Sequence, residues 1–446
     1  MESLMIKDKL SKSLEMQRRA KRLIPGMTQL LSKRPDMFSL GVWPGYFSKA
    51  KGAIIWDLDG NEYVDMSLSG VGANVLGYAD QDVDEAVKQA IAKGTSSSLN
   101  CLEEVKLAEF LCELHPWAEM VRYTRTGGEA MAVAVRIARA HTGRDKVAFC
   151  GYHGWHDWYL AANLGSENAL GEHLLPGLNP AGVPKGLVGT AFPFRYNHLD
   201  ELEEIVAAHG KELAAVVMEP IRNLDPEPGF IEGVRALADE AKAVLIMDEI
   251  SAGFRLTTGG AHLVVHKEIP DIAVFSKALG NGYPIAAVIG KAVVMEAAQN
   301  SFISSTCWTE RIGPTAAIAT LEKHLKNKVA MHLIKLGDKV QHGWRRAASK
   351  HGLSIHVGGI KPLSHFSFNG EHAEAMKAYF IQLMLEQGFL ASSLYYPMYA
   401  HTDEHVHLYL EAVDKAFAEL AGALERMDLQ DKLEGQPASF GFKRLT

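Results

Sequence analysis

The strongest constraint in this sequence is a series of short, uninterrupted apolar segments that alternate with segments of helical periodicity. The apolar segments are residues 147–149, 214–218, 244–247, 272–275 and 285–289, and they are rich in Val, Ile and Ala. Because they lack the apolar–polar alternation of a half-exposed strand, we expect strands that are buried on both faces. Buried strands separated by helices predict an α/β fold with a largely parallel sheet.

Further elements are expected on both sides of this pattern. Helices are expected at 82–93, 103–115 and 128–141. An amphipathic helix is expected at 4–23, and a hairpin with strands at 53–57 and 62–66 around Asp59-Gly60. Near the end, a helix-rich stretch at 310–350 precedes strands at 354–357 and 363–368 and helices at 371–387 and 403–425.

These elements predict three parts of the chain. An N-terminal arm with the hairpin would cover 1–75, a large α/β domain 76–325, and a smaller α/β domain 326–446. No low-complexity linker separates the last two parts, so we expect their boundary to lie within a long helix.

The composition is that of an ordinary globular protein, and it excludes several function classes. Of the 446 residues, 47% are apolar and 22% are charged, and the net charge is −7. These values argue against a disordered chain, and the missing basic excess argues against a general nucleic-acid binder. No apolar run approaches the roughly 18 residues that a membrane span needs.

The cysteines and the first residues bear on the compartment. The four cysteines lack the short paired spacings of a zinc ribbon or a redox motif, and they are too few for a disulfide framework. Residues 1–23 are basic but contain acids and no continuous apolar core, which fits neither a secretory signal nor a transit peptide. We therefore expect a cytoplasmic protein.

Charged residues stand directly after three of the apolar strands. Glu219 follows one strand, Asp248 follows the next, and Lys277 lies two residues after a third. A single charged residue at this position commonly marks the exit of a strand into solvent. Three of them on consecutive parallel strands would meet at one sheet edge, where open α/β sheets bind ligands. A lysine for a Schiff base and an acid for a ring nitrogen are what pyridoxal phosphate requires.

Two further features suit that cofactor. Thr126, Gly127 and Gly128 precede the helix expected at 128–141, and a glycine-containing helix N-terminus favours a phosphate group. Tyr152 follows the strand at 147–149 and is placed to stack on an aromatic ring.

Together these motifs resemble the class III pyridoxal-phosphate aminotransferases, with glutamate-1-semialdehyde 2,1-aminomutase as the most similar subgroup. The resemblance runs from Trp56-Asp57-Leu58-Asp59-Gly60 to about residue 425. It rests on the order and spacing of these segments: Thr126-Gly127-Gly128-Glu129-Ala130, Tyr152-His153-Gly154, Glu219-Pro220, Asp248-Glu249-Ile250 and Ser276-Lys277.

The resemblance implies a fold-type I enzyme with a mostly parallel seven-stranded sheet, working as a homodimer with shared active sites on small amine and carbonyl substrates. Lys277 would form the Schiff base, Asp248 would pair with the ring nitrogen, and Glu219 would order the site. Tyr152 and Ile250 would lie on the two ring faces. Phosphate would be held by Thr126, Gly127, Gly128 and, from the partner subunit, Thr306, with Thr309 as the alternative.

Three departures from the family pattern leave the reaction open. Arg125 is an additional cation that either reaches a phosphate or acidic substrate group or points away. Residues 278–284 differ from the glycine-rich run of the aminomutase, as do residues 308–311 from its usual Ser-Gly-Asn-Pro. An aminotransferase is favoured, an aminomutase is the alternative, and a non-catalytic relative would be expected to lack Lys277 or Asp248.

Histidine spacings raise a metal site as a possibility, and we expect none. His153 and His156 lie beside Tyr152, where packing at the cofactor site explains them better. His401, His405 and His407 stand at the start of a helix. No Cys or acidic residues complete a defined coordination geometry around either group.

Overall fold

The computed structural model describes residues 5–166, 169–171, 177–439 and 441, and its chain forms two compact units. One unit is Gln81–Met331, here called the sheet unit. The other combines Met1–Asp80 with His332–Thr446 and is here called the terminal unit. The arm expected at 1–75 therefore clusters with the C-terminal part, and the second boundary falls inside a long helix, α12 (Val329–Lys350).

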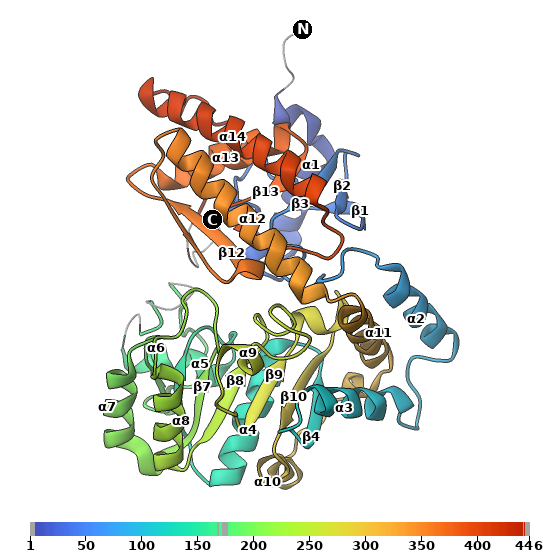
Figure 1. The fold of residues 1–446 in the computed structure, drawn as a ribbon, viewed down its shortest axis with the longest axis vertical. Helices are drawn as coiled ribbons and strands as arrows, with labels where there is room; N and C mark the ends of the chain where they lie inside the picture. Colours follow the sequence, from blue (N-terminus) through green and yellow to red (C-terminus); the bar gives the residue numbers. More distant parts are fainter. Residues whose placement is uncertain (1–4, 167–168, 172–176, 440, 442–446) are drawn as a thin grey trace. The chain divides into compact units, whose positions relative to one another are not determined.

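A seven-stranded sheet forms the centre of the sheet unit (Figure 1). Its strands, in spatial order, are β4 (Met120–Thr124), β10 (Ala286–Gly290), β9 (Ile272–Phe275), β8 (Val244–Asp248), β7 (Leu213–Met218), β5 (Lys146–Cys150) and β6 (Ala191–Pro193). Strand β10 is antiparallel to both of its neighbours, and the other pairs are parallel. The expected mostly parallel sheet is confirmed, and β4 and β6 are strands that the sequence reading did not identify.

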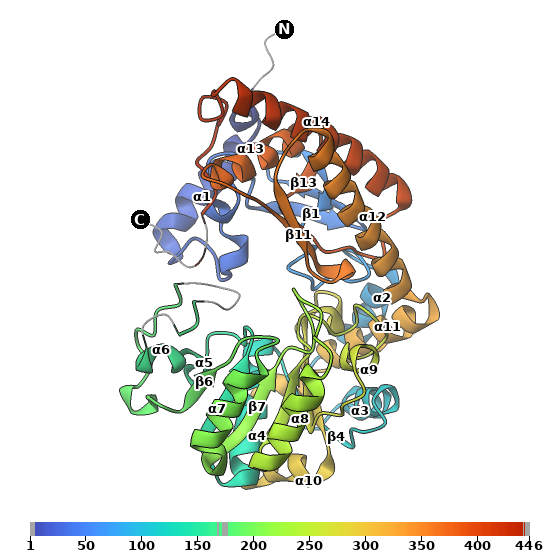
Figure 2. The same cartoon turned by 60° about the vertical axis from the view of Figure 1, so that its left-hand side comes forward.

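Helices cover both faces of this sheet, which explains why its central strands, β7 to β10, are fully buried and almost entirely apolar. Helix α4 (Gly127–Thr142) packs its small and branched residues against alternate residues of the strands, such as Val217 and Ile246. Helices α7 (Leu199–His209) and α8 (Phe230–Ala241) lie on the opposite face (Figures 1 and 2). This placement follows from right-handed crossovers that run in opposite directions along the sheet.

The remaining α-helices of the sheet unit are shorter or peripheral. They are α2 (Gln81–Ala92), α3 (Leu102–Leu114), α5 (Asp157–Leu160), α6 (Ala162–Gly165), α9 (His262–Val265), α10 (Ala292–Met295) and α11 (Ile312–Lys326). The helix-rich stretch expected at 310–350 consists of two helices, α11 and α12. Lys328, at φ +51°, adopts a left-handed conformation that a continuing helix does not contain.

The terminal unit contains two small sheets and a helical layer. One sheet joins β1 (Phe47–Lys51), β2 (Ile54–Asp57), β3 (Glu62–Met66) and β13 (Phe389–Ala391); the other joins β11 (Ile355–Gly358), β12 (Ser364–Phe368) and β14 (Leu394–Tyr395). Its helices are α1 (Ser11–Leu23), α12, α13 (Ala373–Glu386) and α14 (Asp403–Glu425).

One strand pair explains why the two ends of the chain form one unit. The expected hairpin is present as β2 and β3, and β3 pairs in parallel with β13 from the C-terminal part. The helix expected at 4–23 is a 3-10 turn at Ile6–Lys9 followed by α1, and residue 4 lies outside the described residues. Among the described helices, none has both the length and the hydropathy of a membrane span.

Candidate active site

The carboxyl ends of the parallel strands bring the predicted residues to one edge of the sheet. Asp248 is the last residue of β8, Glu219 follows β7 directly, and Lys277 begins the short 3-10 helix after β9. Tyr152 follows β5 and Thr126 follows β4 on the same edge. The strand order therefore explains how residues 150 positions apart meet in one site.

Lys277 has the properties of a reactive amine. Its Nζ donates a hydrogen bond to Ser251 Oγ at 2.5 Å. Burial lowers its pKa to about 7; the Arg222 guanidinium lowers the pKa further, whereas the Glu219 and Asp248 carboxylates act in the opposite direction. A substantial fraction of this amine is therefore neutral, and hence nucleophilic, near neutral pH.

Asp248 is held in a fixed orientation by two donors. The carboxylate is 3% exposed; its Oδ1 accepts the Ile250 amide at 3.0 Å, and its Oδ2 lies 2.7 Å from His153 Nδ1. The other ring nitrogen, His153 Nε2, lies 3.0 Å from the Cys150 carbonyl oxygen. Both ring nitrogens therefore face oxygen acceptors, and the imidazole fixes the orientation of the Asp248 carboxylate.

Glu219 forms an ion pair beside the lysine. It is 8% exposed, and its Oε1 accepts a hydrogen bond from Arg222 Nη1 at 2.9 Å. Its Oε2 accepts the Tyr152 amide at 3.4 Å. Arg222 also lowers the pKa of Tyr152, which burial raises, so the guanidinium lies within electrostatic range of both Tyr152 and Lys277.

The start of α4 has a capping box and two closely packed glycines. Thr126 is the N-cap and forms a capping box with Glu129. A Cβ on Gly127 would lie 2.8 Å from Ile250 Cδ1, and a Cβ on Gly128 would lie 2.8 Å from His156 Cε1. A side chain at either position would displace Ile250 or His156, and the amides of Gly127 and Gly128, at the first two helical positions, have no intrahelical acceptor.

Thr306 is placed differently from the other predicted residues. It is exposed at the start of the 3-10 helix Thr306–Thr309, and the Thr309 hydroxyl donates to its carbonyl oxygen at 2.9 Å. Arg125 anchors this segment: its Nη2 donates to the carbonyl oxygens of Trp308 and Glu310, both at 2.9 Å, and pairs with Glu310 Oε1 at 3.0 Å. Arg125 therefore positions the 308–310 segment.

Sequence reasoning missed part of this site. Arg222 and Ser251 were not identified, and His153 was assigned to packing. Their positions carried a signal, since Arg222 lies three residues after Glu219, Ser251 three after Asp248, and His153 directly after Tyr152. Side chains near a buried charge at a strand end are those most expected to partner it.

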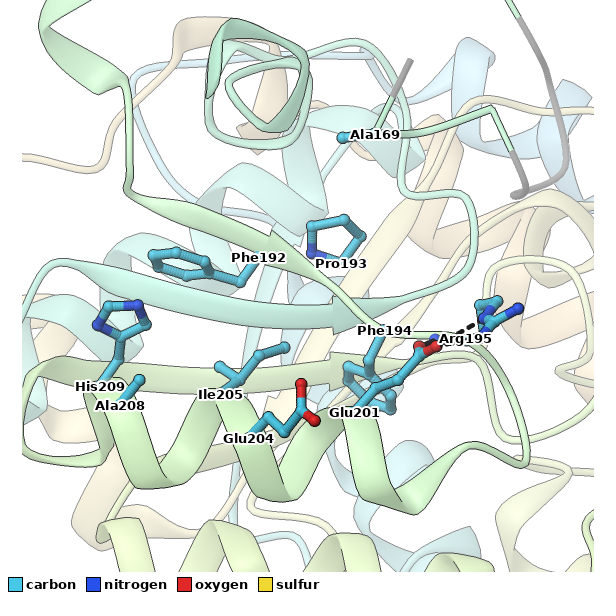
Figure 3. Close-up of a pocket in the computed structure, with 10 residues that line it drawn as sticks. All are labelled: Ala169, Phe192, Pro193, Phe194, Arg195, Glu201, Glu204, Ile205, Ala208 and His209. Carbon is cyan, nitrogen blue, oxygen red and sulfur yellow. Dashed lines mark hydrogen bonds and ion pairs between the residues drawn. The ribbon is translucent and has the colours of Figure 1, made fainter. Parts of the chain in front are cut away.

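Other features of the protein are separate from this site. A hollow of about 580 Å³ lies between the edge strand β6 and α7, with the Arg195–Glu201 ion pair at one end (Figure 3). None of the predicted site residues lines it. His401 is bound to protein groups, because its Nε2 donates to the Asp65 carbonyl oxygen at 2.8 Å. Within the described ranges, no group of three His, Cys, Asp or Glu side chains is arranged to hold a metal ion.

The residues fit pyridoxal phosphate. An amine with a lowered pKa, a buried carboxylate and a glycine cradle at a helix N-terminus stand at one sheet edge, and His156 Nδ1 beside the cradle is buried with no hydrogen-bond partner in the described structure. Fold and site together define a pyridoxal-phosphate-dependent enzyme of fold type I.

The comparisons give the family. The class III aminotransferase family profile matches residues 41–417, and the chain belongs to this family. It is 33% identical, over 92% of its length and 98% of the relative, to a 3-aminobutyryl-CoA aminotransferase from Cloacimonas acidaminovorans. It is also 33% identical, over 91% and 97%, to a glutamate-1-semialdehyde 2,1-aminomutase from Desulforamulus reducens.

Solved structures agree with this assignment. The FumI protein of Sphingopyxis sp. MTA144, with pyridoxal phosphate, superposes with a TM-score of 0.83 at 25% identity, over 96% of this chain and 99% of that one. A transaminase with bound pyridoxal phosphate gives 0.81 at 27% identity, over 93% and 98%. The predictions of a fold-type I, pyridoxal-phosphate-dependent aminotransferase are confirmed.

Proposed function

We propose that this aminotransferase moves an amino group between an amine or amino acid and a carbonyl compound by means of Lys277. The observation that carries the proposal is the lowered pKa of the Lys277 amine, which lies within electrostatic range of the Asp248 carboxylate that His153 contacts. Lys277 would hold the cofactor through its Nζ and, once released from it by the substrate amine, would move the proton of the amine-bearing carbon. When bound, pyridoxal phosphate supplies a pyridinium ring, which takes up the electron pair that remains on this carbon after the proton is removed.

The other predicted site residues would bind the cofactor and fix its orientation. Asp248, fixed by His153, would keep the ring nitrogen of the cofactor protonated, because a carboxylate favours the charged form of a neighbouring base. Tyr152 and Ile250 would hold the two ring faces, and Glu219 would order the site through its contacts with Arg222 and the Tyr152 amide. Thr126, Gly127 and Gly128 form the phosphate cradle.

We further propose a homodimer with shared active sites, in which Thr306 contributes to the phosphate cradle of the partner subunit. Large apolar side chains are exposed in the sheet unit: Phe302 is 88% exposed, Leu99 81% and Leu102 61%. Such exposure is typical of protein–protein contacts. Thr306 lies four residues after Phe302 and is itself exposed.

Subunit mixing tests the shared site. Lys277→Ala and Thr306→Val are each expected to be impaired as homodimers. In a mixed dimer, one site carries both substitutions and the other carries neither, so activity returns on mixing. If each subunit completes its own site, every site carries one substitution and mixing restores nothing. Light scattering gives the mass of the assembly independently.

The alternative is an aminomutase, which returns the amino group to the same molecule. It is favoured by the glutamate-1-semialdehyde aminomutase relative, which is as similar in identity as the aminotransferase relative. Residues 278–284 and 308–311 depart from the aminomutase pattern and support the aminotransferase.

A panel of amino donors decides between the two. The absorbance of the bound cofactor is followed with each donor alone, including 3-amino acids, glutamate and alanine. A transaminase stops after one conversion per site until a carbonyl acceptor is added. Continued turnover of glutamate-1-semialdehyde without an acceptor would establish the aminomutase.

A cytoplasmic location is also proposed. Its support is that Cys101, Cys112, Cys150 and Cys307 are all unpaired thiols, which suits a reducing compartment. Cell fractionation with detection of the protein tests the location, and recovery outside the cytoplasmic fraction would contradict it.

A further inference from the structure

The segment Trp155-His156 packs over the first turn of α4. A Cβ built on Gly128 would lie 2.8 Å from His156 Cε1, 2.9 Å from His156 Nδ1 and 3.9 Å from Trp155 Nε1. The two rings stack, with centroids 4.4 Å apart and planes at 27°. The imidazole thus takes the space that a side chain at position 128 would need.

This position lies at the positive end of the helix. The Cα–Cβ direction in an α-helix tilts toward the N-terminus, so atoms that fill the Cβ space of Gly128 lie beside the first free amides. Helix α4 has 16 residues, long enough for its N-terminus to favour an anion. The His156 imidazole therefore lies beside the first turn of α4, at the Cβ position of Gly128.

His156 Nδ1 has no hydrogen-bond partner among the described residues, although the atom is buried. Buried polar atoms in folded proteins are nearly always paired with protein, water or ligand groups. Burial lowers the pKa of His156 below its usual value, because its effect outweighs that of the Glu129 and Asp157 carboxylates, which raise the pKa. The ring is therefore mostly neutral near pH 7 and has one N–H to donate.

The threonine hydroxyl of the cradle is already engaged. Thr126 Oγ1 donates to Glu129 Oε2 at 3.1 Å and lies 3.4 Å from the Glu129 amide as its acceptor. The same carboxylate oxygen accepts the amides of Arg125 and Thr126. The capping box thus engages the Thr126 hydroxyl, so that Thr126 offers a phosphate group its backbone rather than a free hydroxyl hydrogen.

We propose that His156 donates a hydrogen bond from Nδ1 to the phosphate of pyridoxal phosphate, with the Trp155 ring holding the imidazole in place. The proposal rests on the phosphate cradle proposed above, and it adds a residue from the loop after β5 to that cradle.

The test compares two ligands, with the wild type and three variants. His156→Phe keeps an aromatic ring but removes the donor, and His156→Asn keeps a donor near the position of Nδ1. Dissociation constants of pyridoxal phosphate and of pyridoxal, which lacks phosphate, are measured by absorbance of the apoenzyme titrated with each. His198→Phe, at a partly exposed histidine away from the cradle, is the matched control.

A phosphate contact predicts a specific result. His156→Phe weakens pyridoxal phosphate roughly 10- to 100-fold, the range for a hydrogen bond to a charged group, and leaves pyridoxal unchanged. His156→Asn restores part of the affinity. The ³¹P chemical shift of the bound phosphate changes in His156→Phe and not in His198→Phe.

Two outcomes would overturn the proposal. Equal weakening of both ligands would mean that His156 acts through the ring site or through folding, and no change in either ligand would mean that it does not touch phosphate. Because Nδ1 is unpartnered without ligand, the melting temperature of the His156→Phe apoenzyme should not fall. Failure of wild type to bind pyridoxal phosphate would instead contradict the cofactor site itself.

Discussion

Two lysines of this protein have strongly lowered pKa values, one in each unit, and they differ in their surroundings. Burial lowers the pKa of Lys277 to about 7 in the sheet unit and that of Lys377 to about 8 in the terminal unit. Lys377 Nζ donates to the backbone carbonyl oxygen of Met37 at 2.9 Å, and Glu374 is the charge that raises its pKa. Lys277 instead faces two cations and two carboxylates at a strand end.

The comparison shows that withdrawal of an amine from solvent does not by itself create a catalytic residue. Lys377 lies on helix α13, and its amine donates a hydrogen bond to a backbone carbonyl oxygen. That carbonyl group is fixed by the fold and does not exchange with a ligand. Lys277 binds a serine hydroxyl, which exchanges partners at little cost, and it stands where a ligand can enter from the sheet edge. Position in the topology, more than burial, separates the two.

The largest expected effect is the loss of activity in Lys277→Met, by roughly 10³-fold or more, because the covalent and proton-transfer group is removed. The absorbance band of the lysine-bound cofactor should disappear with it. The matched substitution Lys377→Met should leave both the band and turnover intact and change only the melting temperature. A Lys277→Met protein with an unchanged band would contradict the assignment.

The second prediction repeats the comparison with aspartates. Asp248 and Asp65 are each 3% exposed, but Asp248 faces His153 at the sheet edge and Asp65 accepts the Tyr78 hydroxyl in the terminal unit. Asp248→Asn removes the charge that keeps the ring nitrogen protonated, so turnover should fall about 100-fold or more while cofactor is retained. Asp65→Asn should alter stability only. Steady-state kinetics and thermal melting separate the two, and equal kinetic losses would remove the distinction.

These pairs show what the sequence could predict and why. Lys277, Asp248 and Glu219 were predictable because parallel strands place their carboxyl ends on one edge, so strand order alone brings them together. His153, Arg222 and His156 were not, because their roles depend on side-chain directions in the loops that follow β5 and β7. The capping box that occupies Thr126 likewise depends on the rotamer of Glu129.

The boundaries of the units show a second limit. The hairpin at 53–66 was readable from its turn, but its pairing with β13, more than 300 residues away, left no local signal. Backbone pairing between distant strands depends on how the whole unit packs, which a propensity pattern does not encode. For this reason the sequence predicted residues 1–75 as a separate arm, whereas in the structure the arm belongs to the terminal unit.

A third prediction concerns the charges around Lys277. Removing either charge is expected to change the rate of cofactor capture at a given pH several-fold. The guanidinium of Arg222 lowers the pKa of this amine and the Glu219 carboxylate raises it. Arg222→Gln should therefore raise the pKa and leave less neutral amine at pH 7, whereas Glu219→Gln should do the opposite. The rate at which apoenzyme captures pyridoxal phosphate, measured from pH 6 to 9, should shift to higher pH in the first variant and to lower pH in the second.

The control for this pair is another arginine–glutamate contact. Arg195 and Glu201 form a 2.5 Å ion pair beside the hollow of Figure 3, away from Lys277. Arg195→Gln should leave the pH profile of cofactor capture unchanged. Shifts of the same sign in Arg222→Gln and Glu219→Gln would show that these residues act by positioning rather than by charge.

The smallest expected effect is a change in stability with pH, and it follows from a comparison of two buried histidines, His153 and His401. His153 faces two oxygen acceptors, whereas His401 accepts the Met398 amide at Nδ1 and donates from Nε2 to the Asp65 backbone carbonyl oxygen, which requires a neutral ring. Burial lowers the pKa of His401 to about 3. Its folded pKa lies below the unfolded value of about 6.5, so the unfolded state binds more protons between these pH values and stability falls as pH drops below 6.5.

At pH 5.5 this single group should therefore cost about 1.4 kcal/mol relative to pH 7.5. Denaturant unfolding of the apoenzyme at the two pH values measures that difference in wild type and in His401→Asn. The variant is less stable at both, since it loses a buried network, but its pH-dependent loss should be smaller by about that amount. An unchanged pH dependence would mean that His401 is released before the global transition, so that the terminal unit opens locally around it.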